Sequence, residues 1–287
     1  MRKRLKKYLT KLAGRRLNLW YEISPEKAIK KSIDYFLSPR QGKINGEIPL
    51  FLTTANQTEK INIEDKNLQT YIWKRGNKKV LLAHGWESNS SRWEKLIEKL
   101  LEENFTVISI DAPAHGKSEG EYSNVPLYGK AIDFLVRKYE INYAIGHSLG
   151  GFTLLFQQYQ KEIPYLEKMI LLAPATEMKN ILNGFQQTLG LKNTLMQGME
   201  NYFEEKFKYS LSDFSILKLV KENPIPTLFI HDKEDRIVNY QESKNIVNQW
   251  KNSELVLTQG LRHGLKGEYV IKIIIEYLKR EIQIKNS

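Results

Sequence analysis

The stretch Ile145-Gly146-His147-Ser148-Leu149-Gly150-Gly151 has the pattern Gly-x-Ser-x-Gly, and it decides the fold. An apolar, strand-like segment at 142–145 precedes it, and an apolar stretch with helical spacing follows it. Gly146 and Gly150 lack a Cβ, so the strand, the turn and the helix can approach closely. The Ser148 hydroxyl would then stand at a helix N-terminus, where backbone N–H groups favour developing negative charge. This context predicts a nucleophile elbow with Ser148 as the nucleophile.

Outward from this stretch, short apolar runs alternate with amphipathic helical patterns from residue 79 onward. Apolar runs without polar alternation are typical of parallel strands that helices cover on both faces. The expected strands are 80–83, 106–110, 142–145, 169–172, 227–230 and 254–257, and the expected helices are 91–103, 125–139, 240–250 and 268–282. The pattern predicts an α/β fold with a mostly parallel central sheet and helices on both faces.

The segment before residue 79 has a different pattern. A helix is expected at 25–37, where Ser24 can act as N-cap and Pro25 occupies the first helical position. Short strand patterns separated by turn residues follow at 48–53, 60–63 and 68–73. These strands predict an antiparallel N-terminal part of the sheet.

The expected domain organisation has four parts. Residues 1–40 are a basic N-terminal extension and helix, and 41–174 are the first part of the α/β core. Residues 175–222 break the alternation, with apolar positions at helical spacing in a polar segment. They leave the sheet at the edge where such sheets bind ligands, which favours a helical cap insertion over a helical excursion on the sheet edge. Residues 223–287 complete the core.

Composition excludes several kinds of chemistry. The 287 residues include no cysteine, so disulfides, thiolate metal sites and a cysteine nucleophile are excluded. The five histidines lack a His-x-x-x-His spacing, so we expect no metal site. Catalysis by a serine nucleophile would require no cofactor, so none is expected. No apolar run approaches the length of a transmembrane helix. The formal charge is +11, but no nucleic-acid-binding signature accompanies it, so no nucleic-acid partner is expected.

Much of the positive charge lies at the start of the chain, where eight basic residues precede the first acid, Glu22. Leu5, Leu9 and Leu12 fall at helical spacing, which predicts a short basic amphipathic helix over 2–13. Such a helix can rest on an anionic membrane surface, and residues 2–16 would make that contact. The alternative is a solvated extension packed loosely on the core. The expected location is cytoplasmic, or peripheral to a membrane; no oligomeric state is predicted.

A serine hydroxyl is a weak nucleophile at neutral pH and needs a base. On a sheet of this kind the order along the chain is serine, acid, histidine. His263 follows the last expected strand and is the expected base, since only His231 is also late in the chain. The candidates for the acid are Asp232, Glu234, Asp235 and the more distant Glu177. Composition does not separate them.

Hydrolysis at a carbonyl also needs backbone N–H groups to stabilise the oxyanion. One donor is expected from Leu149, the residue after the nucleophile. The other is expected from the loop after an early strand, where Gly85 permits a tight turn and Trp86 presents its N–H. The side chain of His84 is expected to hydrogen-bond to the backbone of this loop.

Five segments together resemble α/β-hydrolase-fold serine hydrolases of the esterase and monoacylglycerol-lipase-like kind. They occur in the family's order at 84–86, 111–118, 146–151, 231–235 and 262–263. The resemblance spans about residues 47–282, and the 175–222 insertion matches weakly.

The resemblance implies Ser148 as nucleophile, Asp235 as acid and His263 as base, with the N–H groups of Trp86 and Leu149 as the oxyanion hole. It implies cleavage of a small-molecule carboxylic ester through an acyl-enzyme intermediate. Two alternatives stay open. One is an acyl thioesterase or acyltransferase with the same three residues, and the other is a non-catalytic binding protein on the same scaffold.

Overall fold

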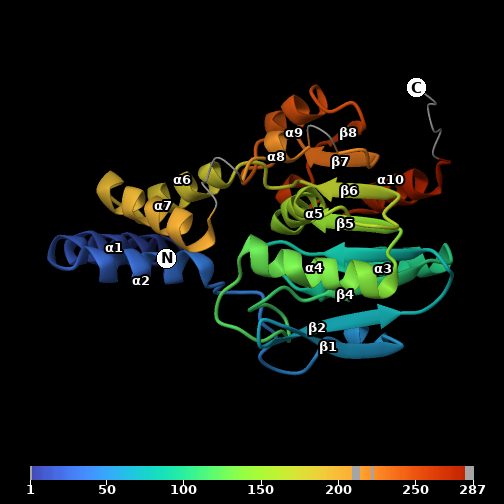
Figure 1. Cartoon of the computed structure of the whole chain (residues 1–287), viewed down its shortest axis with the longest axis horizontal. Helices are drawn as coiled ribbons and strands as arrows, with labels where there is room; N and C mark the ends of the chain where they lie inside the picture. Colours follow the sequence, from blue (N-terminus) through green and yellow to red (C-terminus); the bar gives the residue numbers. More distant parts are fainter. Residues whose placement is uncertain (1, 209–213, 221–222, 282–287) are drawn as a thin grey trace. The chain divides into compact units, whose positions relative to one another are not determined.

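A computed structural model describes residues 2–208, 214–220 and 223–281. Within these residues, eight strands form one sheet in the order β1-β2-β4-β3-β5-β6-β7-β8 (Figure 1). The strands are β1 (Gln57–Ile63), β2 (Lys66–Trp73), β3 (Lys79–Ala83), β4 (Thr106–Ile110), β5 (Tyr143–His147), β6 (Lys168–Leu172), β7 (Thr227–Asp232) and β8 (Ser253–Thr258). From β4 to β8 all neighbours pair in parallel, whereas β2 is antiparallel to both β1 and β4. The predicted mostly parallel sheet with an antiparallel start is confirmed.

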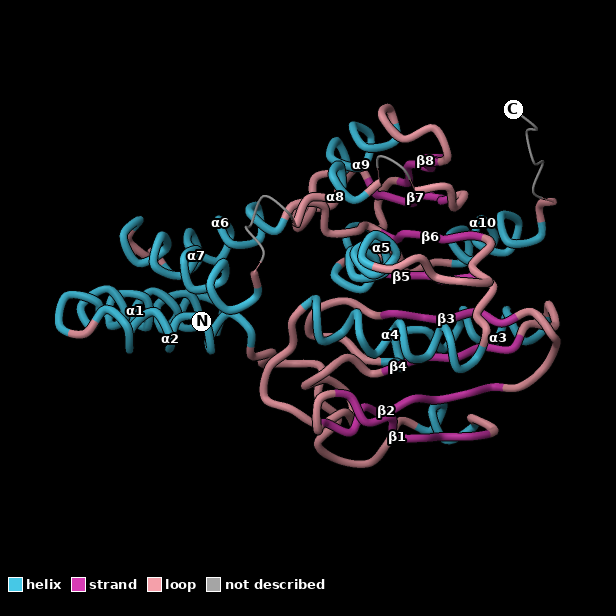
Figure 2. The backbone as a smooth tube through the Cα atoms, in the orientation of Figure 1, coloured by secondary structure: helices cyan, strands magenta, loops and turns pink. Residues whose placement is uncertain are grey.

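Helices cover both faces of this sheet (Figure 2). They are α3 (Glu94–Glu102), α4 (Val125–Tyr139), α5 (Leu149–Gln160), α9 (Tyr240–Val247) and α10 (Glu268–Lys279). Apolar residues of α3 and α10 share one buried cluster with alternate residues of the central strands, such as Val80 and Leu82. Helices α4 and α5 contact each other and β3. Because both faces are covered, β5, β6 and β7 are buried along their whole length, which is why they read as unbroken apolar runs.

The strand expected at 48–53 is wrong. Residues Leu50–Thr54 form a single 3₁₀ turn instead. The hydroxyls of Thr53 and Thr54 donate to the carbonyls of Leu50 and Phe51, 2.7 Å away in each case, and so satisfy the turn locally. Leu52 is buried and its neighbour Phe51 packs against the same cluster, so two consecutive residues contact the core, unlike the alternating face of a strand.

Some element ends also differ from the expected ones. The helix expected at 91–103 is a 3₁₀ turn, Ser90–Trp93, followed by α3, and the Asn89 side chain accepts the Ser91 N–H at the start of the turn. Helices α9 and α10 end a turn or less before the expected residues 250 and 282. Residue 282 itself lies outside the described residues, as do 209–213 and 221–222 of the expected 175–222 insertion.

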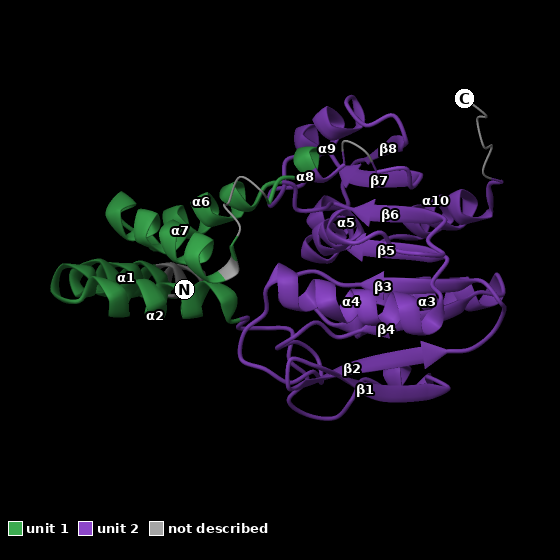
Figure 3. Ribbon diagram, in the orientation of Figure 1, with its two compact units in different colours: residues 1–38, 177–218 green, residues 39–176, 219–287 purple. Residues whose placement is uncertain are grey.

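The chain divides into two compact units, residues 1–38 with 177–218, and residues 39–176 with 219–287 (Figure 3). The second unit contains the sheet. The first contains α1 (Arg2–Ile23), α2 (Pro25–Leu37), α6 (Met178–Leu189) and α7 (Asn193–Phe207), and the short α8 (Ile216–Leu219) lies at the boundary. This division differs from the expected one, in which residues 1–40 and 175–222 were separate parts.

The helical unit has an apolar core of its own, to which both of its chain segments contribute. Leu17, Ala28 and Ile33 of the first segment pack with residues of the second. The second segment supplies Leu182, Leu189, Leu191, Leu195, Met196 and Met199. Pairing the two segments buries apolar side chains of each, and packing of this kind supplies most of the stability of helices in proteins.

Helix α1 is longer than the expected 2–13 and runs to residue 23, with Pro25 opening α2 just beyond it. Gly14, in the middle of α1, lets the helix approach α6 closely, since a Cβ there would lie 2.0 Å from the Leu189 carbonyl oxygen. Side chains of α1 also bind carbonyls at the C-terminal end of α6. Lys11 Nζ donates to Gln187 at 2.6 Å, and Asn18 Nδ2 donates to Gly190 at 2.8 Å. The first helix is therefore fixed to its unit rather than loosely attached.

In the part of the chain that the structure describes, no helix has the length and apolar character needed to cross a membrane.

Candidate active site

Ser148 lies in a sharp turn between β5 and α5. Its φ of +52° falls in the left-handed region, which non-glycine residues seldom adopt. The turn is so tight that no side chain would fit at either neighbouring glycine. A Cβ on Gly146 would lie 2.5 Å from the Gly151 Cα, and one on Gly150 would lie 2.2 Å from the Ala83 carbonyl oxygen. The Gly-x-Ser-x-Gly pattern thus lets the helix begin directly against β3 and β5.

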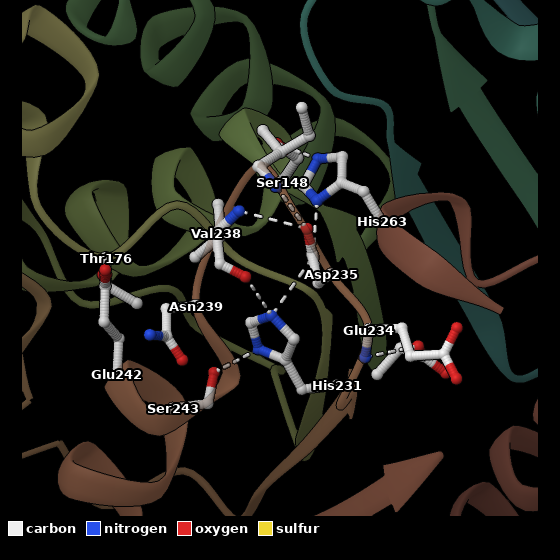
Figure 4. Close-up of polar contacts among 12 residues, drawn as sticks. Ser148, Thr176, His231, Glu234, Asp235, Val238, Asn239, Glu242, Ser243 and His263 are labelled. Atoms are coloured by element: carbon white, nitrogen blue, oxygen red, sulfur yellow. Dashed lines mark hydrogen bonds and ion pairs between the residues drawn. The ribbon is translucent and has the colours of Figure 1, made fainter. Parts of the chain in front are cut away.

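His263 and Asp235 lie beside Ser148 (Figure 4). His263 comes from a short 3₁₀ turn, Arg262–Gly264, after β8, and its Nε2 is 3.1 Å from Ser148 Oγ. The other ring nitrogen, Nδ1, is 2.7 Å from Asp235 Oδ2. The Asp235 side chain is fully buried, whereas 21% of the His263 side chain is exposed. The loops after β5, β7 and β8 thus bring a hydroxyl, a carboxylate and an imidazole into one hydrogen-bonded chain.

The other carboxylates considered for the acid bind elsewhere. Asp232 is buried and accepts hydrogen bonds from the Thr258 hydroxyl at 2.7 Å and the Leu261 N–H at 3.0 Å, so it ties the end of β7 to the end of β8. Glu234 is exposed. Glu177 belongs to the helical unit, where it accepts a hydrogen bond from the Ser215 hydroxyl. Of the four candidates, only Asp235 is hydrogen-bonded to His263.

Asp235 is held as a carboxylate by several donors. Burial alone would raise its pKa, but hydrogen bonds from His231 and His263 and from the Ile237 N–H outweigh burial and lower the pKa below its ordinary value. The N–H groups of Ile237 and Val238 donate to Oδ1 at 2.8 and 3.1 Å. This arrangement leaves Oδ2 directed at the two imidazoles.

His231 is a residue whose part in the site the sequence pattern did not reveal. Its Nδ1 lies 2.7 Å from Ser243 Oγ, and its Nε2 lies 3.2 Å from Asp235 Oδ2 and 3.0 Å from the Val238 carbonyl oxygen. A carbonyl oxygen only accepts, so Nε2 carries the proton and donates to Asp235, while Ser243 donates to Nδ1. The signal in the sequence was its place at the end of β7, four residues before the acid.

His147, the variable residue inside the Gly-x-Ser-x-Gly pattern, also contacts the site. Its Nε2 is 2.8 Å from the carbonyl oxygen of His263, which fixes Nε2 as the donor. Burial is the main reason that its pKa lies well below the ordinary value. A neutral imidazole on the strand before Ser148 thus holds the backbone of the loop that carries His263.

The expected oxyanion donors lie on either side of Ser148. Leu149 is the first residue of α5, and the N–H of such a residue has no acceptor within its own helix. Gly85 lies against Ser148, because a Cβ on Gly85 would be 2.9 Å from Ser148 Cβ, and Trp86 follows it. The structure therefore places the loop of Trp86 next to Ser148.

Buried histidines hold this loop in place. The Ala112 N–H donates to His84 Nε2 at 2.9 Å, and His84 Nδ1 lies 2.8 Å from the Gly85 carbonyl oxygen. The Glu87 N–H donates to His115 Nε2 at 3.0 Å. His84 therefore binds the backbone of its own loop, as its position in the sequence suggested.

Asp111, at the end of β4, braces the neighbouring loops. Its carboxylate accepts the N–H groups of Ser90 and Lys117 at 2.8 and 2.9 Å. Burial raises its pKa above the ordinary value despite these donors. Gly116 permits the wrapping, because a Cβ there would lie 2.0 Å from an Asp111 carboxylate oxygen. Within the described residues, no group of three or more His, Cys, Asp or Glu residues is placed to hold a metal ion.

Two of the buried histidines, His84 and His147, predict that the fold loses stability in mild acid. Burial lowers the pKa of both His84 and His147 well below the ordinary value, so the folded state keeps them neutral where the unfolded chain binds protons. Their stabilising effect is complete above the unfolded pKa and is lost as the pH falls below it. The free energy of unfolding, measured with urea, should fall between about pH 6.5 and about pH 5, by up to about 1.4 kcal/mol per histidine per pH unit.

The variant His147→Gln is the control for this prediction. It keeps a side-chain donor for the His263 carbonyl but removes one titrating group. The plot of unfolding free energy against pH should become less steep, by an amount that corresponds to at most one proton taken up on unfolding. An unchanged slope would contradict the role given to His147.

Comparisons with known proteins identify the family and the fold of the chain. The family described as "Serine aminopeptidase, S33" matches residues 75–224, just over half of the chain. A pimeloyl-(acyl-carrier protein) methyl ester esterase of Pectobacterium atrosepticum is 28% identical over 144 residues, which are 50% of this chain and 53% of that protein. The chain thus spans about half the length of that curated relative.

Solved structures share the fold. An esterase of Pyrococcus furiosus matches with a TM-score of 0.63 and 20% identity, over 85% of this chain and 97% of that one. A monoacylglycerol lipase of Paleococcus ferrophilus matches with a TM-score of 0.59 and 22% identity, over 74% of this chain and 98% of that one. At these identities the likeness is one of fold. The fold, the nucleophile elbow and the family match lead to one conclusion: the chain belongs to the serine aminopeptidase S33 family of α/β-hydrolase proteins.

Proposed function

We propose that the protein is a serine hydrolase that cleaves carboxylic esters, with Ser148, His263 and Asp235 as its catalytic residues. The observation that carries the proposal is the hydrogen-bonded chain from Ser148 Oγ to His263 Nε2, at 3.1 Å, and from His263 Nδ1 to Asp235 Oδ2, at 2.7 Å. These distances suit proton transfer from a hydroxyl to a base whose orientation a carboxylate fixes.

The reaction proceeds in two similar halves. Ser148 Oγ attacks the ester carbonyl carbon while His263 Nε2 accepts the hydroxyl proton. The resulting oxyanion is held by the N–H groups of Trp86 and Leu149. Collapse breaks the bond to the alcohol, which leaves with the proton from His263. Water then attacks the acyl-enzyme with His263 again as base, and the carboxylic acid is released. Asp235 stays ionised throughout and stabilises the imidazolium, consistent with its lowered pKa.

The names of related proteins support ester hydrolysis over other acyl transfers. The Pectobacterium relative is named as a methyl ester esterase, and both fold neighbours are named as an esterase and a lipase. The family description names a peptidase, so amide substrates belong in the test. The cap role predicted for 175–222 and a cytoplasmic or membrane-peripheral location stay predictions.

A fluorophosphonate probe and a substrate panel test the proposal together. We expect the probe to form one adduct, located on Ser148 by peptide mass analysis. The panel contains nitrophenyl esters of increasing acyl length, an acyl thioester, and an aminoacyl nitroanilide. Turnover of the esters with little turnover of the anilide supports an esterase. Preference for the thioester favours the thioesterase alternative, and absence of both adduct and turnover favours the non-catalytic alternative.

The variant His231→Phe is expected to lower kcat about tenfold and to leave KM unchanged. It removes the Nε2–H that lies 3.2 Å from Asp235 Oδ2, and a hydrogen bond to a charged group contributes about 1.5–3 kcal/mol. KM is unaffected because His231 is buried behind Asp235 and does not reach substrate. Steady-state kinetics on a nitrophenyl ester measure the effect. A variant that raises KM at wild-type kcat would contradict this role.

A further inference from the structure

The outward face of α1 carries an apolar stripe that none of the described residues covers. The helix packs through Gly14 and Leu17 onto the rest of its unit. On the opposite side, residues recur at alternating spacings of four and three, which align along one face of a helix. These residues are Leu5, Leu9, Leu12, Arg16, Leu19 and Ile23.

Most of the stripe is exposed. The exposed fractions are 58% for Leu5, 53% for Leu9, 67% for Leu19 and 83% for Ile23. Leu12 is partly exposed. Isolated exposed leucines are ordinary, but four exposed apolar side chains aligned on one face of a 22-residue helix mark a surface that binds something.

The charge around the stripe points to an anionic occupant. Arg15 and Arg16 are exposed, and among the described residues no carboxylate lies within ion-pair distance of either. Eight basic residues and no acid precede Glu22 along the helix. Two exposed aromatic residues, Tyr8 and Trp20, flank the apolar line. An apolar line that is flanked by aromatic side chains on a basic helix is typical of a helix that lies at a lipid–water interface.

A second copy of the same helix fits this face less well. Pairing two copies would place Arg16 in the apolar seam and bring two strongly basic helices together. On a bilayer, the Arg16 side chain can extend its charged end to the phosphates while its methylenes lie with the leucines. We propose that the outward face of α1 binds the surface of an anionic phospholipid bilayer. The proposal does not depend on the reaction at Ser148.

Co-sedimentation of the full chain with phospholipid vesicles tests the proposal. Wild-type protein should bind vesicles that contain phosphatidylglycerol and phosphatidylcholine, and bind pure phosphatidylcholine much more weakly. The double variant Leu9→Glu, Leu19→Glu should lose more than about tenfold in affinity, because two leucines no longer enter the bilayer. The matched control is Leu50→Glu, the same change at a leucine of the other unit that is 83% exposed, and it should bind as wild type does.

A second pair of changes separates charge from apolar contact. Arg15→Gln, Arg16→Gln should weaken binding to the phosphatidylglycerol vesicles roughly 30-fold, since each basic residue near such a surface contributes about 1 kcal/mol. Added salt should weaken wild-type binding in the same direction. Turnover of a soluble ester should be unchanged in every variant, so a failure of binding is distinguishable from a failure of catalysis.

Two results would overturn the proposal. One is equal binding of the wild type and the Leu9→Glu, Leu19→Glu variant to the anionic vesicles. The other is wild-type protein that ignores these vesicles but forms a dimer, seen by sedimentation velocity, that the same variant abolishes. That second result would assign the stripe to another copy of the chain.

Discussion

The variant Ser148→Ala is expected to lose at least about 10⁴-fold in kcat on an activated ester and to keep its fold. Alanine removes the hydroxyl that lies 3.1 Å from His263 Nε2, so no acyl-enzyme can form. Any remaining turnover would come from substrate binding and the backbone donors. The measurement is hydrolysis of a nitrophenyl ester, with thermal unfolding as the check on folding.

A matched serine supplies the control. Ser253, at the start of β8, uses its hydroxyl to donate to the Trp250 carbonyl and lies away from the elbow. Ser253→Ala should retain wild-type kcat. If Ser148→Ala retained a tenth of the activity or more, the reaction would have to use another nucleophile.

Asp235→Asn is the second substitution with a large expected effect, a loss of about 10⁴-fold in kcat. The amide keeps the shape of the carboxylate but can donate to His263 Nδ1. That contact favours the tautomer with the proton on Nε2, which cannot accept the proton of Ser148. The loss of negative charge also removes the stabilisation of the imidazolium. Steady-state kinetics should show the loss in kcat, because Asp235 is buried away from substrate.

Substitutions of the other three candidate acids are the controls for this prediction. Glu234→Gln and Glu177→Gln should keep wild-type kcat, since neither carboxylate contacts His263. Asp232→Asn should mainly lower stability, because Asp232 accepts the hydrogen bonds that join β7 to β8. Should Asp235→Asn stay active while one of these three loses activity, the acid has been assigned to the wrong residue.

Much of the sheet could be predicted because strands that are buried on both faces appear in the sequence as runs of consecutive apolar residues. The strands β5, β6 and β7 contain no polar alternation, and their bounds were close to those expected. The antiparallel hairpin was also expected, although its turn, Glu64-Asp65, uses two non-glycine residues with positive φ. The segment at 48–53 misled because a short apolar run fits a strand and a 3₁₀ turn equally well.

Long-range pairing could not be predicted from local pattern. The first helix was expected to end at residue 13, whereas the structure continues it and uses Gly14 for the approach of α1 to α6, more than 160 residues away. The apolar spacing of each segment predicts a helix but does not identify its partner. For this reason the two segments were expected to be separate parts, and the structure groups them in one unit.

In the candidate site, too, local sequence identified some residues, whereas contacts between distant segments could not be predicted. Ser148 and His263 were separable from other residues by motif and chain order. The four possible acids could not be separated, because the structural difference between them is where each carboxylate points and which groups it hydrogen-bonds. The contributions of His231 and His147 depend on which carbonyl or carboxylate each ring nitrogen meets, and such contacts between loops leave no periodic signal.

The close approach of Gly150 to the Ala83 carbonyl joins the start of α5 to the end of β3, more than 60 residues away in sequence. Ala83 ends the strand that leads to Trp86, and Gly150 lies two residues after Ser148. Libraries that diversify residues around the site should keep position 150 constant, since any bulkier residue would push the start of α5, which follows Ser148, away from the end of β3, which precedes the loop of Trp86.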